Sequence, residues 1–130
     1  MAYMPYVTAD EYIDLVAVGY PAIPSEQLDL FLKTASRQID TLTFNRIVKR
    51  TFGKLTEFQQ EIIKEVVCKQ AGFLFENQDA IESILDSYSI NGVSMHFGTG
   101  FNVELKSGVP IQRTVYSLLE QTGLCWRGAV

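Results

Sequence analysis

Residues 57–78, "EFQQEIIKEVVCKQAGFLFENQ", carry the pattern that decides the fold. Apolar residues recur there at three- and four-residue steps, which is typical of a helix. Thr56 and Gln59 form a capping-box pattern, which satisfies free amides at a helix start. The apolar stripe is formed by Phe58, Ile62, Val66 and Phe73 and widened by Ile63, Val67, Ala71 and Leu74. A helix with so broad an apolar face is predicted to be buried on more than one side.

Two helices are predicted before this one. Residues 23–47, "IPSEQLDLFLKTASRQIDTLTFNRI", place apolar residues at helical spacing, with Ser25 as the expected N-cap. Gly53 is expected to break that pattern. Upstream, Thr8 and Glu11 form a second capping box, so "TADEYIDLV" predicts a short first helix.

In the C-terminal third of the chain the spacing of apolar residues changes from helical steps to alternation. Residues 93–97 and 101–105 alternate apolar and polar side chains around Gly98-Thr99-Gly100, which predicts a β-hairpin. A last helix, "IQRTVYSLLEQTGL", is expected to begin at Pro110 and to have Gly123 at its C′ position. The residues expected in the core are Leu32, Ile39, Phe58, Ile62, Val66, Leu118 and Leu119.

These elements predict a mainly α fold, a small helical bundle of three to five helices with one β-hairpin or extended loop. The 130 residues have the size of one domain, with a hairpin and loop at 88–110 and a C-terminal tail at 123–130. No apolar run approaches the length of a membrane span, and no basic residue precedes an apolar stretch as in a secretory signal. Two cysteines are too few for a disulfide framework, so a reducing, cytosolic compartment is expected.

Charge is distributed in blocks along the chain. The net charge is −4, which argues against broad binding to phosphate backbones. Residues 1–32 hold five acids and no base, whereas residues 33–54 hold six bases and one acid. Such alternation suits a protein whose acidic surface contacts the basic surface of another copy. The alternative, held equally open, is that the blocks mix on the folded surface.

No residue set with catalytic or metal-binding spacing is found in the sequence. The only histidine, His96, has no carboxylate or cysteine spaced for a metal, and "GTG" at 98–100 lacks the context of a dinucleotide loop. Glu57, Glu61 and Glu65 have Lys64 and Lys69 beside them and are expected on a solvated face. We therefore expect no enzyme activity, no cofactor and no metal.

The end of the chain, "LLEQTGLCWRG" at 118–128, combines a helical turn, a glycine and then a cysteine, a tryptophan and an arginine. Four stretches, "TADEYIDL", "LKTASRQIDTLTFNRI", "FQQEIIKEVVCKQAGFLFEN" followed by "SYSINGVSM", and the ending "VYSLLEQTGLCWRG", resemble the head–tail connector, or adaptor, proteins of long-tailed bacteriophages and of prophages in Gram-positive bacteria. The four stretches span nearly the whole chain. Asn91 precedes Gly92 here, which displaces a glycine of the family's strand pattern.

The resemblance implies a virion protein at the head–tail junction, assembled in the host cytoplasm. Its subunits would form a ring, a dodecamer by analogy, between the portal protein and the tail-completion or stopper protein, and DNA would pass through the lumen without sequence-specific binding. Leu124, Trp126 and Arg127 would dock on the portal, since Trp and Arg are common at binding hot spots. The hairpin residues Met95, Phe97, Phe101 and Val103 would contact neighbouring subunits.

Three alternatives remain open at this point. The first is another neck or tail-tube component, although a tail protein is expected to have more strand. The second is a small helical DNA-binding or partner-binding regulatory module, for which the cluster Arg46, Lys49, Arg50 and Lys54 is the best candidate. The third is that Trp126 folds back on its own core.

Overall fold

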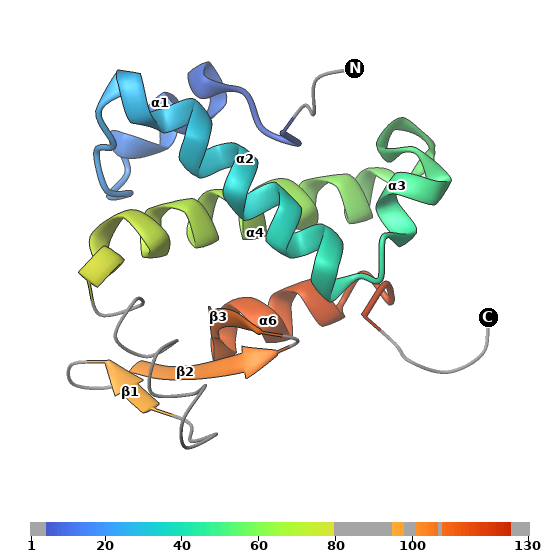
Figure 1. Cartoon of the computed structure of the whole chain (residues 1–130). Coiled ribbons are helices and arrows are strands. Elements are labelled where there is room, and N and C mark those ends of the chain that lie inside the picture. Colours follow the sequence, from blue (N-terminus) through green and yellow to red (C-terminus); the bar gives the residue numbers. More distant parts are fainter. Residues whose placement is uncertain (1–4, 80–94, 98–100, 107, 126–130) are drawn as a thin grey trace.

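The computed structural model describes residues 5–79, 95–97, 101–106 and 108–125 (Figure 1). The chain is mainly helical with a small antiparallel sheet, which confirms the predicted fold class. The elements in chain order are α1 (Ala9–Val16), α2 (Ser25–Leu42), α3 (Arg46–Arg50), the 3-10 helix η1 (Phe52–Lys54), α4 (Glu57–Glu76), β1 (Met95–Phe97), β2 (Phe101–Lys106), β3 (Val109–Gln112) and α6 (Arg113–Glu120).

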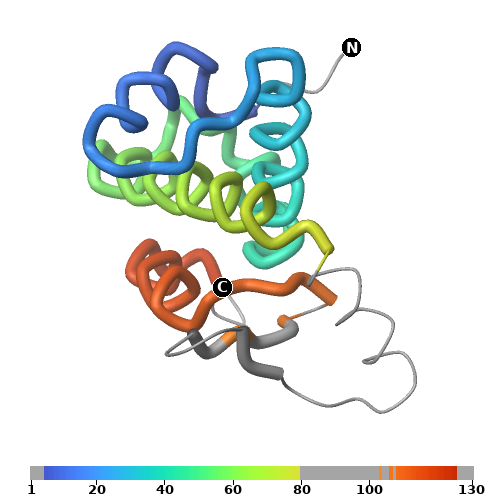
Figure 2. Tube along the Cα trace, turned by 90° about the vertical axis from the view of Figure 1, so that its left-hand side faces the viewer, coloured from blue at the N-terminus to red at the C-terminus, as the bar shows by residue number. Residues whose placement is uncertain are grey.

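Helix α4 is the middle of three layers. Helices α1 and α2 lie on one side of it, and α6 with the sheet lies on the other (Figure 2). Ile63, Val66, Val67 and Ala71 are each fully buried, as the broad apolar face predicts. One apolar cluster runs through all the layers, from Val7 to Cys125.

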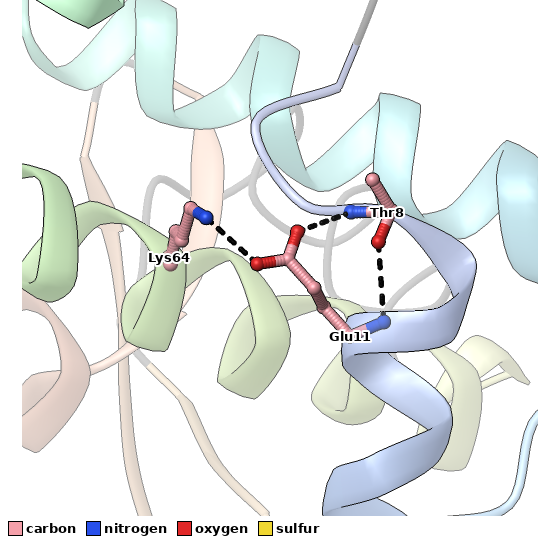
Figure 3. A network of polar contacts seen from close by, with 3 residues as sticks. All are labelled: Thr8, Glu11 and Lys64. Carbon is pink, nitrogen blue, oxygen red and sulfur yellow. Dashed lines mark hydrogen bonds and ion pairs between the residues drawn. The ribbon is translucent and has the colours of Figure 1, made fainter.

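Capping boxes start two of the helices, as predicted. At α4, Gln59 N donates to Thr56 Oγ1 and Thr56 N donates to Gln59 Oε1, both at 3.1 Å. At α1, Glu11 N donates to Thr8 Oγ1 and Thr8 N donates to Glu11 Oε1 (Figure 3). The second carboxylate oxygen of Glu11 lies 2.7 Å from Lys64 Nζ, so the start of α1 is tied to the middle of α4.

The connection from α1 to α2 packs closely on α4. The Tyr12 hydroxyl donates to the carbonyl of Pro21 at 2.6 Å. A Cβ at Gly72 would lie 3.1 Å from Pro21 Cδ and 3.2 Å from Tyr12 Oη, so a side chain there would push the connection away. The glycine therefore permits the close approach of the two segments.

The second helix differs from its prediction at both ends. Its N-cap is Pro24 rather than Ser25, which is the first helical residue and makes no capping bond. The helix ends at Leu42 and does not run on toward Gly53, and the Thr43 N–H and hydroxyl both donate to the Ile39 carbonyl at its end. Phe44 and Asn45 follow with φ of 57° and 58°, a left-handed turn that separates α3 from α2.

The last helix begins later than predicted. Pro110 does not start it but lies in β3, opposite Leu105 of β2, and α6 begins at Arg113. Strand β3 is an edge of the sheet β1-β2-β3, where a residue without an N–H is tolerated. The predicted hairpin is confirmed as the β1–β2 ladder, in which Phe97 pairs with Phe101.

Most of the predicted core is confirmed. Leu32, Ile39, Ile62, Val66 and Leu119 are buried, and Leu118 is half-buried. Phe58 is 53% exposed, so its assignment to the core is wrong. In this first turn of α4 the side chains of Gln59 and Gln60 bond the Thr122 and Leu55 carbonyls, which leaves Phe58 facing solvent.

Glu11→Gln tests the link between α1 and α4, because glutamine keeps the capping oxygen and removes the charge. The hydrogen bond from Lys64 is the main cause that lowers the pKa of Glu11 below 4.5. A lowered pKa stabilises the fold above the ordinary glutamate range, and the gain is lost as pH falls through the lowered pKa. We expect the variant to lose less than about 1 kcal/mol at neutral pH, because water screens a pair whose side chains are 40% and 42% exposed.

Denaturant unfolding of both proteins from about pH 7 down to about pH 3 measures this difference. The gap between wild type and variant should close on the acid side. Glu61→Gln removes an exposed carboxylate that makes no ion pair among the described residues, and is the matched control. An equal gap in the control, or a gap that does not change with pH, would contradict the assignment.

Candidate docking surfaces

The C-terminal segment after α6 is anchored on the bundle. Gly123, with φ of 77°, lies two residues after the C-cap Gln121, one position later than the expected C′. The Thr122 hydroxyl donates to the Leu119 carbonyl at 2.7 Å and accepts from Leu124 N at 3.2 Å. The chain therefore turns sharply and its next residues run back toward the helices.

Two side chains from other elements hold this turn. Arg46 of α3 donates through Nη1 to the Leu124 carbonyl at 2.9 Å, and Gln59 of α4 donates through Nε2 to the Thr122 carbonyl at 3.0 Å. Both carbonyls follow a helix end, where backbone acceptors lack helical partners. The turn is thus fastened to α3 and α4 at the point where the described chain ends.

The anchored C-terminal turn buries Leu124, which was expected to dock on the portal protein. This side chain is 2% exposed, and Cys125 is 8% exposed, so both belong to the core. The prediction that Leu124 is free to dock on a partner is wrong, because it fills apolar space behind the turn. Trp126 and Arg127 lie outside the described residues and stay predictions.

The strand pair is only partly described. Val103 of β2 is 4% exposed and packs in the core, so its predicted role in subunit contacts is wrong. Its partner across the ladder in β3 is Gln112, which leads directly into α6. The backbones of Met95, Phe97 and Phe101 are placed in the ladder, and their side chains lie outside the description.

The basic residues between Arg46 and Lys54 have two different environments: one holds the C-terminal turn and the others face solvent. Arg46 is half-buried, holds the C-terminal turn and lies over the Phe44 ring at 5.2 Å. Lys49, Arg50 and Lys54 are exposed. Helix α3 has five residues and a length of about 7 Å, which is short for a helix that reads several bases in a groove.

The anchoring residues were not identified from the sequence. In the sequence, Gln59 stands out only as part of a capping box, and Arg46 only as part of a basic cluster. Arg46 and Leu124 are 78 positions apart, and no periodic pattern relates them. The contact depends on how α3 and α6 are placed by the core, which a local pattern does not encode.

An open groove of about 780 Å³ runs between the α1–α2 connection, α4 and α6. Its lining includes Tyr20, Lys69, Gln112 and Ser117, and Lys69 Nζ lies 5.7 Å from the centre of the Tyr20 ring. The lining mixes carboxylates, amides and hydroxyls with apolar side chains, Phe73 and Val115 among them.

Within the part of the chain that the structure describes, no three His, Cys, Asp or Glu residues lie close enough to hold a metal ion. Over the same residues, no helix combines the length and the apolar character needed to cross a membrane. Comparison of the chain with protein-family models, with curated proteins and with solved structures found no match.

Both cysteines are free thiols inside the fold. Burial is the main cause that raises the pKa of Cys68 to about 12 and the pKa of Cys125 to about 11. The positive charge of Arg46 acts in the opposite direction on Cys125 and lowers its pKa. Cys125 lies inside the anchor, so its reactivity reports whether the anchor is closed.

Arg46→Gln should release the C-terminal turn and increase the rate at which iodoacetamide alkylates Cys125 several-fold, while Cys68 stays protected. The sign is diagnostic. Loss of the nearby cation alone would raise the pKa of the Cys125 thiol and slow the reaction, because the thiolate is the nucleophile. Peptide mass spectrometry after timed alkylation measures each cysteine separately.

Lys49→Gln removes a cation of the same helix and is the matched control, with no change expected at either cysteine. A Cys125 rate that stays constant or falls in Arg46→Gln would show that the arginine does not hold the segment. Equal acceleration at both cysteines would indicate loss of the whole fold instead.

Proposed function

We propose that this chain is a structural subunit of a bacteriophage head–tail connector. In this proposal its copies form a ring, a dodecamer by analogy with the family, that binds the portal protein on one side and the tail-completion or stopper protein on the other. DNA passes through the lumen without sequence-specific contacts. The protein acts through its surfaces and catalyses no reaction.

The anchored C-terminal turn is the observation that carries the proposal. A free chain end is usually poorly ordered unless something ties it down. Here Arg46 and Gln59 fasten residues 122–124 to two helices, and Trp126 and Arg127 follow directly in the sequence. A segment that starts from a fixed point loses less conformational entropy on binding, so a Trp-Arg pair placed after the anchor suits a docking role.

The order of the sequence motifs supports the same proposal. The described parts of the four stretches that resemble connector proteins fall on α1, on α2 with α3, on α4, and on α6 with the turn up to Cys125, while residues 87–94 and 126–128 lie outside the described residues. The net charge of −4 suits a channel wall past which DNA must slide, because a strongly basic lumen would retain phosphates.

A small DNA-binding regulator is the second candidate. The exposed Lys49, Arg50 and Lys54 favour it, since three bases close in sequence suit phosphate contacts. The shortness of α3 and the acidic net charge favour the connector instead. The two candidates differ in partner, which makes them separable by binding measurements.

Trp126→Ala should leave the melting temperature nearly unchanged and weaken binding to the portal protein of the same phage by about 2 kcal/mol or more, the loss typical of a buried aromatic anchor. Surface plasmon resonance on immobilised portal and thermal unfolding of the same samples measure the two effects. Trp126→Phe keeps an aromatic ring and is the matched control, with most of the affinity retained.

Electron microscopy of wild-type protein mixed with portal should show an added ring below the portal. A large fall in melting temperature with unaltered portal binding would mean that Trp126 packs on its own core. Tight binding to duplex DNA at physiological salt, without portal binding, would favour the regulator.

A further inference from the structure

The exposed large apolar side chains gather at two places in the fold. Among the described residues they fall into two groups of three. Three lie on α1, on the α1–α2 connection or on the start of α2, and three lie around α3 and the start of α4. They are Ile13, Val18 and Leu30 in the first group, and Phe44, Val48 and Phe58 in the second.

The first group lies among acids, and we name this region the acidic end. It comprises α1, the connection and the first two turns of α2. Asp10, Asp14 and Glu26 are exposed there and form no ion pair with any described residue. Glu11 and Asp29 are paired with Lys64 and Lys33, and residues 1–32 contain no base. The region therefore offers unpaired negative charge beside exposed apolar surface.

The second group lies among bases, and we name residues 44–58 the basic end. Lys49, Arg50 and Lys54 are exposed and make no ion pair with any described residue. Glu57, in the first turn of α4, is the only acid in these fifteen positions. The region therefore carries unpaired positive charge beside its own exposed apolar residues.

Helix α2 holds the two ends apart. It has 18 residues and is about 27 Å long. Leu30 lies in its second turn, and Phe44 lies two residues beyond its last residue. Figure 1 shows α1 and α3 at opposite sides of the view, joined by α2. The unpaired acids of the acidic end are therefore separated on the folded chain from the unpaired bases of the basic end, although Lys33 of the basic sequence block pairs with Asp29 of the acidic one.

We infer that the acidic end of one copy docks on the basic end of the next copy. Two like ends repel each other, whereas unlike ends attract and bring the exposed apolar side chains of both copies together. Such a contact is heterologous, since it joins two different surfaces, and it repeats until the ring closes. The inference rests on the proposed function in that it names the contact between neighbouring subunits of the proposed ring.

Charge exchange between the ends tests this contact. Lys49→Glu with Arg50→Glu makes both ends of a chain acidic, and Asp10→Lys with Asp14→Lys makes both ends basic. Sedimentation velocity at low salt should show concentration-dependent association of the wild type, weakened when salt is raised. Each double variant alone should associate at least about tenfold more weakly, because its unlike ends have become like ends.

An equimolar mixture of the two double variants should recover association. The native acidic end of the first meets the native basic end of the second, and the reversed ends also attract each other. Glu76→Lys with Asp79→Lys reverses two exposed acids near the end of α4 and is the matched control for the net charge of Asp10→Lys with Asp14→Lys, with wild-type association expected. Circular dichroism checks that every variant is folded.

The inference is overturned if the wild type stays monomeric at all concentrations, if either double variant associates like the wild type, or if the mixture does not recover. Portal binding is measured on the same wild-type sample. Recovery in the mixture without portal binding keeps the contact and rejects the connector function. Portal binding with no effect of charge exchange rejects the contact alone.

Discussion

The burial of α4 on two sides is the constraint on which the rest of the structure depends. The fully buried side chain of Gln70 contacts both neighbouring layers. Its amide nitrogen donates to Gln38 Oε1 of α2 at 2.7 Å and to the Pro110 carbonyl of β3 at 2.9 Å. One side chain thus joins the layers above and below the helix. Because a buried amide without partners is costly, the pair of bonds fixes both layers against α4.

Because the faces of α4 are buried between the two layers, the ends of the helices are the surfaces that can contact other proteins. α3 and the start of α4 extend to one side, where Arg46 and Gln59 fasten the C-terminal turn. The α1–α2 connection lies toward the other side, held by Tyr12, Pro21 and Gly72. The proposed functions of the chain, portal docking and contact with other copies, both use these rigid ends and leave the core untouched.

Helices and caps could be predicted from the sequence because their signals are local. The Thr56–Gln59 and Thr8–Glu11 boxes and the apolar stripe of α4 all lie within one or a few turns. The left-handed turn at Phe44 and the strand at Pro110 could not, since the first interrupts a stretch with helical apolar spacing and the second depends on pairing with Leu105 of β2. The burial of Leu124 and Val103 also depends on distant segments, and so the candidate site was predicted less well than the fold.

In the proposed assembly, copies of the chain associate with one another through their unlike ends. Zero-length carbodiimide cross-linking of wild-type protein, made from an equal mixture of isotope-labelled and unlabelled chains, tests this most directly. We expect mixed-isotope peptides that join Lys49 or Lys54 of one copy to Asp10, Asp14 or Glu26 of another. Cross-links confined to single copies, or between copies at other residues, would contradict the account.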